Sequence, residues 1–183
     1  MWSEIFKAIA DVFRSEPPKP LPAPVPVSPY VNRDSNRKAF LAMLRWSEGT
    51  AQIPNSDNGY RALVGGGTFE GYECHPHKLI WIARINKYST AAGAYQILFD
   101  QWQPYIVPLG LKNFSPPYQD LWALNALREV NALDDIDVGR FASAVAKAGN
   151  RWASLPGSKF GQSIRTLAEV TDVYSLAGGQ FAV

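Results

Sequence analysis

The sequence predicts an α+β fold that is predominantly helical, with a small β-hairpin or sheet element inserted after the first helix of its main domain. Three observations support this prediction. Apolar residues recur at three- and four-residue steps over much of the chain beyond residue 90. A glycine triplet at residues 65–67 separates two short segments that fit strands. The balance of 46% hydrophobic to 19% charged residues is typical of a chain with a globular core.

The composition divides the 183 residues into three parts, because proline is concentrated early in the chain. Half of the 14 prolines lie between Pro17 and Pro29. Each ring disfavours the α region for the residue before it, so this stretch predicts an extended spacer on the order of 40 Å long. We therefore expect an amphipathic N-terminal helix at residues 1–16, a proline-rich linker at 17–33 and a catalytic domain at 34–183.

The N-terminal segment has the apolar periodicity of a short amphipathic helix. Its apolar residues recur at helical spacing and are Trp2, Ile5, Phe6, Ile9, Val12 and Phe13. A helix of about three turns is marginal in water, so this face needs a surface to pack against. One interpretation is docking on the main domain or self-association. The other is contact of residues 1–16 with a membrane interface or a partner protein.

The first helix of the main domain is expected from Arg37 to about Glu48. Ser35 or Asn36 can cap its start, and Gly49 is suited to end it. Two strands about the glycine triplet are expected at residues 60–64 and 68–72.

Three further helices are expected in the second half of the chain. Ser115 precedes two prolines, which marks a helix start, and the apolar residues that follow are Leu121, Leu124, Leu127 and Val130. Asp137 can cap the next helix, whose apolar stripe is Val138, Phe141, Val145 and Ala148. The last helix is marked by Ile164, Leu167, Thr171 and Tyr174.

Charge and targeting signals exclude several classes of function. The net charge is +2 and no Lys/Arg block exists, so we expect no nucleic-acid partner. No apolar run approaches the roughly 20 residues of a membrane span. Residues 1–14 are not a secretory signal, because Glu4, Lys7 and Asp11 interrupt the apolar stretch and no cleavage site follows.

Metal and thiol chemistry are also not expected. Cys74 is the single cysteine, so the fold must be stable without an intramolecular disulfide. Cys74, His75 and His77 are too close in sequence to surround one ion, and no second cluster completes a site. We therefore expect neither a metal nor another cofactor.

Glu48 is the strongest candidate for chemistry from its position alone. It follows Phe40 and Leu44 at four-residue steps and so lies on the apolar stripe of its helix. It is also in the last turn, where free carbonyls present partial negative charge. Burial and that dipole both disfavour the ionised carboxylate, and both should raise the pKa of Glu48 toward the range of a general acid.

Collinear motifs then give the chain a resemblance to phage lambda-type endolysins, from about Asn36 to Leu167. The matching segments are Trp46-Ser47-Glu48-Gly49-Thr50, Val64-Gly65-Gly66 with Phe69, His75-Pro76, Lys78-Leu79, Ser89-Thr90 with Gly93, Tyr95-Gln96-Ile97-Leu98, Leu109-Gly110-Leu111-Lys112 with Phe114-Ser115-Pro116, and Trp152-Ala153-Ser154-Leu155-Pro156-Gly157. The chain also resembles the broader lytic transglycosylase pattern. It does so through Ser47-Glu48, then Gly93-Ala94-Tyr95-Gln96, then Ala148-Gly149-Asn150.

The resemblance implies a lysozyme-like fold and a lytic transglycosylase that cuts the MurNAc-GlcNAc β-1,4 bond of peptidoglycan. It implies that Glu48 is the catalytic acid and base and that Ser47, Gln96 and Asn150 belong to the substrate-binding site. Glycan clefts also need flat apolar faces, and four aromatic residues lie in or beside the motifs: Tyr60, Tyr95, Trp152 and Phe160. We assign Trp46, Trp81 and Trp122 to the core.

A hydrolytic muramidase at the same site remains the main alternative, because Asp57, Glu70 and Glu73 lie in the expected β region. The lambda-type pattern commonly has an aspartate after its Gly-Tyr pair, whereas Gly59-Tyr60 is followed here by Arg61. A non-catalytic wall-binding or virion module is a third interpretation. For an endolysin we expect a monomer that is held in the host cytoplasm and reaches periplasmic peptidoglycan through a separate membrane-permeabilising protein.

Overall fold

A computed structural model of the chain describes residues 31–158 and 165–182. Its helices are α2 (Arg33–Ser47), α3 (Phe99–Trp102), α4 (Pro116–Glu129), α5 (Leu133–Asp137), α6 (Phe141–Ala148) and α7 (Leu167–Leu176). Its strands are β1 (Ile80–Ile82) and β2 (Lys87–Ser89), and short 3-10 turns occupy Thr50–Gln52, Ala83–Ile85 and Gln103–Tyr105. The predicted class, mostly helical with a small antiparallel sheet after the first domain helix, is confirmed. The predictions for residues 1–16, for the linker as far as residue 30 and for Phe160 lie outside the described residues.

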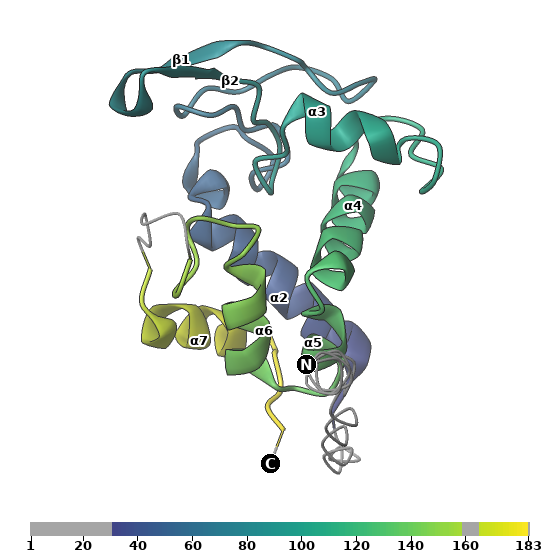
Figure 1. Cartoon of the computed structure of the whole chain (residues 1–183), viewed down its shortest axis with the longest axis vertical. Coiled ribbons are helices and arrows are strands. Elements are labelled where there is room, and N and C mark those ends of the chain that lie inside the picture. The colour runs from purple at the N-terminus through teal and green to yellow at the C-terminus, as the bar shows by residue number, and fades with distance from the viewer. Residues whose placement is uncertain (1–30, 159–164, 183) are drawn as a thin grey trace, which may run out of the picture.

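Helix α2 runs through the middle of the molecule and organises the two ends (Figure 1). The hairpin of β1 and β2 lies with α3 at one end, and α5, α6 and α7 lie at the other (Figure 1). The side of α2 that faces inward is apolar, with Phe40 and Leu44 fully buried. At the end formed by α6 and α7, Phe40 packs edge-on against Phe141, which stacks on Tyr174 at 4.4 Å.

The start of α2 differs from the sequence-based prediction. The helix begins at Arg33, and its cap is Asn32, whose side chain accepts hydrogen bonds from the backbone N–H groups of Asp34 and Ser35. Asn36 is instead fully buried in the second turn, where its side chain bonds to Ile136 and Gln180. The prediction was wrong because the side chain of Asn36 hydrogen-bonds to Ile136 and Gln180 instead of capping the helix. Sequence spacing does not reveal these tertiary contacts.

The glycine triplet does not form the predicted hairpin. Around it the backbone makes a single antiparallel bridge between Ala62 and Thr68. The sheet lies further on, where Trp81 of β1 pairs with Tyr88 of β2. Trp81 is 48% exposed and packs against Tyr88, so its assignment to the core was wrong, whereas Trp122 is buried as expected.

The later helices follow the prediction with two corrections. Helix α4 begins after Ser115 as expected, and Leu127 is buried as predicted, but Leu121 is exposed and Trp122 takes its place in the core. Asp137 ends α5 and forms an ion pair with Arg37 instead of capping α6. Helix α7 begins after Thr166, which forms a capping box with Glu169.

Candidate active site

Glu48 lies directly after α2, where the helix is ended by Gly49. Its backbone N–H still donates to Leu44, and Gly49 takes a φ of 75°, a left-handed conformation in which a side chain is disfavoured. This turn directs the Glu48 side chain into a cleft of about 430 Å³. The described residues that line this cleft are Glu48, Ile85, Tyr95, Gln96, Leu98, Gln101, Trp122, Arg151, Trp152 and Ala153.

The carboxyl group of Glu48 is held by a serine from a distant segment. Ser154 donates a hydrogen bond through its Oγ to Oε1 of Glu48. The Oγ of Ser47 donates in turn to the Oγ of Ser154 at 3.0 Å. Ser47 and Ser154 are both buried, so this chain of hydrogen bonds fixes the orientation of one carboxyl oxygen.

The environment of Glu48 favours a protonated carboxyl group. Burial raises the pKa of Glu48, and the hydrogen bond from Ser154 offsets part of that effect because it stabilises the charged form. A carboxyl group with a raised pKa can keep its proton until a leaving oxygen needs it. The prediction of a raised pKa is therefore confirmed, with burial as its main cause.

Among the described residues that line the cleft, Glu48 is the one carboxylate. Asp57 lies elsewhere and accepts a hydrogen bond from the hydroxyl of Tyr72, whose pKa is raised by burial and by that carboxylate. Glu70 forms an ion pair with Arg61, and Glu73 is exposed. None of these three carboxylates is among the residues that line the cleft with Glu48.

Gln96 lines the cleft from a tight turn that depends on Gly93. The Nε2 of Gln96 donates to the carbonyl of Gly93 at 3.2 Å. Gly93 has a φ of 76°, and a Cβ there would lie 2.2 Å from Oε1 of Gln119, which accepts a hydrogen bond from Ala94. Gly93 therefore permits the close approach of α4 to the turn that presents Gln96.

Tyr60 and Tyr95 share a polar network below the cleft. The hydroxyls of both tyrosines donate to Oδ1 of Asp120 and accept from Arg45. Burial raises the pKa of Tyr60 to about 12 and the pKa of Tyr95 well above its usual value. Tyr95 contributes to the cleft wall with 1% of its surface exposed, and Tyr60 is not among the lining residues. The geometry therefore gives both hydroxyls partners within the protein.

Of the two remaining predicted site residues that the structure describes, Trp152 lies in the cleft and Asn150 lies outside its lining. Trp152 lines the cleft, and its Nε1 donates to the carbonyl of Tyr95 at 3.2 Å. Asn150 is exposed, its side chain donates to the carbonyl of Lys147, and it is not among the lining residues. The structure therefore brings Glu48, Tyr95, Gln96 and Trp152 to one cleft and leaves Ser47, Tyr60 and Asn150 outside its described lining.

Sequence reasoning did not single out several residues of the site. Ser154 and Ala153 lie inside a motif segment, which was the available signal, but no residue pattern pointed to a hydrogen bond with Glu48. Besides Ala153, the lining residues that were not predicted are Leu98, which also lies in a motif segment, and Ile85, Gln101, Trp122 and Arg151. They come from four separate segments, and only the fold brings them together.

The histidines near Cys74 have structural partners. The Nε2 of His75 bonds to the carbonyl of Ile97 at 2.9 Å, and its Nδ1 accepts from the backbone N–H of His77. Burial lowers the pKa of His75. Within residues 31–158 and 165–182, no group of three His, Cys, Asp or Glu side chains is placed to hold a metal ion, and none of the helices has the length and apolar character of a bilayer span.

A mostly helical fold with a small sheet and a partly buried glutamate in a cleft defines a lysozyme-like glycan-cleaving enzyme. Comparison with known proteins agrees with this class. Residues 38–181 match the family described as Endolysin. The chain is 42% identical to the endolysin of Escherichia phage lambda over 151 residues, which are 81% of this chain and 95% of the relative. The chain therefore belongs to the endolysin family, whose members degrade peptidoglycan.

Two further matches support the same assignment. The endolysin of Escherichia phage P2 is 40% identical over 161 residues, which are 82% of this chain and 98% of the relative. The solved structure of bacteriophage lambda lysozyme complexed with a chitohexasaccharide has a TM-score of 0.76 at 42% identity. That match covers 80% of this chain and 96% of the lysozyme chain.

Proposed function

We propose that this endolysin is a lytic transglycosylase that cleaves the MurNAc-GlcNAc β-1,4 bond and leaves 1,6-anhydro-MurNAc ends. The observation that carries the proposal is the single carboxylate, Glu48, among the described residues that line the cleft. Glycosidases that use water ordinarily need two carboxylates that flank the bond. A reaction whose nucleophile is a hydroxyl of the substrate needs only one.

In the proposed reaction Glu48 acts first as an acid and then as a base. Its proton passes to the glycosidic oxygen as the bond from C1 of MurNAc to that oxygen breaks. The ionised carboxylate then takes the proton from the 6-hydroxyl of the same sugar, and the oxygen of that hydroxyl bonds to C1. The glutamate ends protonated, so no water is consumed and no second carboxylate takes part.

The rest of the cleft supplies positioning rather than proton transfer. Gln96 and Gln101 place amide groups on its wall, and such groups can bond to sugar hydroxyls and acetamido groups. Trp152 and Ile85 add apolar surface for a sugar ring. We propose that the cleft accepts a run of β-1,4-linked N-acetylated sugars, as supported by the relative that was solved with a chitohexasaccharide.

Product analysis tests the choice between transglycosylase and muramidase. Purified peptidoglycan is incubated with the enzyme, and the fragments are analysed by mass spectrometry with and without borohydride reduction. Anhydro ends lack one water and do not react with borohydride, and we expect them as the main product. Reducing MurNAc ends would show hydrolysis instead, and Asp57→Asn would then be the next variant to assay.

We also propose that the enzyme is held in the host cytoplasm as a monomer and reaches periplasmic peptidoglycan after a separate protein permeabilises the inner membrane. Its family membership and the Escherichia phages of its relatives support this proposal. Fractionation of producing cells before and after permeabilisation tests it, with wall lysis expected only afterwards. Lysis without permeabilisation would contradict it.

A further inference from the structure

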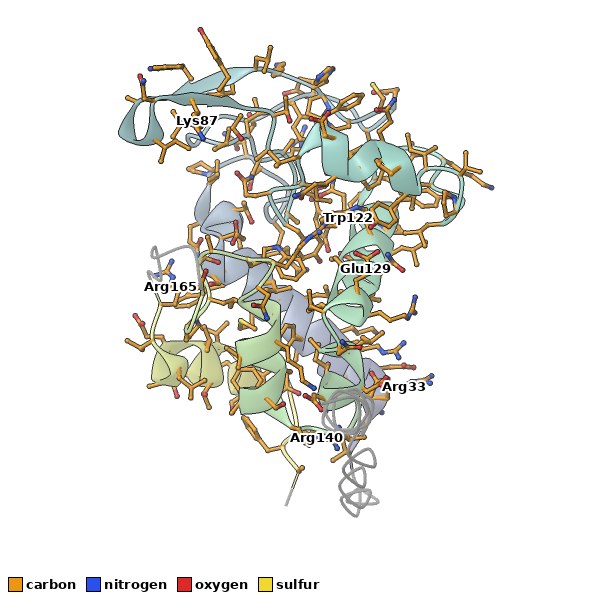
Figure 2. All side chains as sticks on the ribbon, viewed as in Figure 1. Arg33, Lys87, Trp122, Glu129, Arg140 and Arg165 are labelled. Carbon is orange, nitrogen blue, oxygen red and sulfur yellow. The ribbon has the colours of Figure 1, made fainter. Side chains whose placement is uncertain are left out.

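Arg151 is the one cationic side chain among the described residues that line the cleft. It follows α6 in a turn where its backbone N–H donates to the carbonyl of Ala148 at 2.8 Å. Its guanidinium carbon lies 5.0 Å from the centre of the Trp122 ring. Figure 2 shows Trp122 on the part of α4 nearer to α3, and its Nε1 donates to the carbonyl of Gln101 in α3.

The donors of Arg151 are not used by the described part of the protein. Its Nε is buried and has no hydrogen-bond partner, and no described carboxylate forms an ion pair with it. Other arginines are paired, such as Arg37 with Asp137 and Arg140 with Asp135. Buried polar groups are ordinarily satisfied, so an unused guanidinium in a binding cleft indicates an acceptor that arrives with the ligand.

Glu48 is not that acceptor. It forms no ion pair with Arg151, and the shift in its pKa is accounted for by burial and by Ser154. The charge of Arg151 is therefore available to a substrate. The cation–π contact with Trp122 holds the guanidinium in the cleft, and a guanidinium can donate to both oxygens of a carboxylate at once.

We propose that Arg151 binds a carboxylate carried on the lactyl arm of MurNAc and so selects peptidoglycan over neutral β-1,4-linked N-acetylglucosamine polymers. This inference rests on the proposed function, because it assumes that the cleft holds the glycan strand. The two polymers share the same backbone of N-acetylated sugars, and the lactyl arm is where they differ. The carboxylate comes either from the peptide attached to the arm or, where the peptide has been removed, from the lactyl group itself.

Binding measurements in the Glu48→Gln background test this inference without cleavage of the ligand. Three ligands are titrated by calorimetry: chitohexaose, glycan oligomers stripped by an amidase so that the lactyl carboxylate is free, and glycan oligomers that retain their peptides. Adding Arg151→Gln is expected to weaken binding of a carboxylate-bearing ligand about tenfold or more, as for loss of a charge-assisted hydrogen bond. Chitohexaose should bind with unchanged affinity, which also shows that the variant is folded.

Control variants isolate the role of the guanidinium. Arg128→Gln removes the same charge from an exposed site on α4 and should leave all three affinities unchanged. Arg151→Lys keeps the positive charge but lacks the paired N–H donors of the guanidinium, so it should recover only part of the lost affinity. If Arg151→Gln weakens binding of the peptide-bearing ligand alone, the carboxylate comes from the peptide. If it weakens binding of the stripped ligand alone, the carboxylate is that of the lactyl group.

Two results would overturn the inference. One is an equal loss of affinity for chitohexaose, and the other is no loss for either carboxylate-bearing ligand. Failure of the proposed function is distinguished by the products of the wild-type enzyme. If the wild-type enzyme produces reducing ends while Arg151→Gln still weakens binding of the carboxylate-bearing ligands alone, the transglycosylase reaction is wrong and the carboxylate site stands.

Discussion

The Oγ of Ser154 donates a hydrogen bond to Oε1 of Glu48, although 106 positions separate the two residues in the sequence. Ser47, which is next to Glu48, donates to the same Ser154 Oγ and so orients it. The acid is thus held by a hydrogen-bonded chain that begins and ends at neighbouring positions of the first domain helix and its cap. This arrangement leads to specific expectations for the pH dependence of activity.

Glu48→Gln is expected to abolish cleavage of peptidoglycan while leaving the fold intact. Glutamine has nearly the same shape and can still accept the hydrogen bond from Ser154, but it has no acidic proton to transfer. We expect a loss of activity of at least about 10²-fold, the usual size of a general acid contribution. Turbidity assays on purified walls measure it, with thermal melting as the control for folding. Wall lysis at the wild-type rate would remove Glu48 from the mechanism.

Ser154→Ala is expected to move the basic limb of the pH profile to higher pH. The hydrogen bond from Ser154 stabilises the ionised carboxylate, so its removal raises the pKa of Glu48 further and the acid keeps its proton to higher pH. The maximal rate should fall because one carboxyl oxygen is no longer oriented. A profile of kcat/KM against pH measures both effects. Ser175→Ala on the exposed face of α7 is the control, and an unchanged limb in Ser154→Ala would contradict the assignment.

Gly93→Ala is expected to destabilise the protein by about 2 kcal/mol or more, since overpacking and a strained backbone act together. A Cβ at Gly93 would meet Gln119 at 2.2 Å and would also occupy a positive φ. Gly110→Ala is a matched control, because Gly110 has a φ of 62° but open space around it, and its cost should be about 1 kcal/mol. Urea unfolding of both variants measures the difference. Equal destabilisation would show that the contact with Gln119 is unimportant.

His75 should make the protein less stable as the pH falls below 6.5. Burial lowers the pKa of His75 from its ordinary value of 6.5, so between that value and the lowered one the unfolded chain binds more protons than the folded chain. The contribution of neutral His75 is fully present above pH 6.5 and is lost as the pH falls toward the lowered pKa. Protonation of Nδ1 would also remove the acceptor for the N–H of His77.

Melting temperatures measured from about pH 7.5 to about pH 4.5, which brackets the ordinary histidine pKa of roughly 6.5, test this expectation. His75→Gln should flatten the dependence in the upper half of that range, because the titrating group is gone. His77→Gln should retain most of it, since burial is the main cause of the lowered pKa of His75 and the charge of His77 is the smallest. The same slope in His75→Gln as in the wild type would assign the pH dependence to other groups.

Deletion of residues 1–16 tests the interpretation of the N-terminal segment. If its apolar face contacts membranes, the shortened chain should bind anionic vesicles more weakly and cut isolated walls at the same rate. Co-sedimentation with vesicles and the turbidity assay measure the two quantities. Equal vesicle binding by both forms would end the membrane interpretation and favour docking or self-association.

Local signals in the sequence predicted much of the fold where they were not in competition with tertiary contacts. The two prolines after Ser115 marked the start of α4, and the stripe of Phe141, Val145 and Ala148 marked α6. The wrong prediction of the helix cap shows what local signals leave out. Asn36 was a good candidate for a cap by its chemistry, but Ile136 and Gln180 are closer partners in the folded chain.

By itself the sequence determined that Glu48 ends an amphipathic helix on its apolar side, because helical spacing relates it directly to Phe40 and Leu44. Its motifs also indicated the family. Only the tertiary structure decided which groups surround that carboxyl. Ser154, Gln101 and Arg151 come from segments far along the chain, and hydrogen bonds and desolvation depend on distance in space. A pattern of neighbours in sequence has no information about such distances, so Ser154, which bonds to the Glu48 carboxyl, and the residues that share its cleft could be found only in the fold.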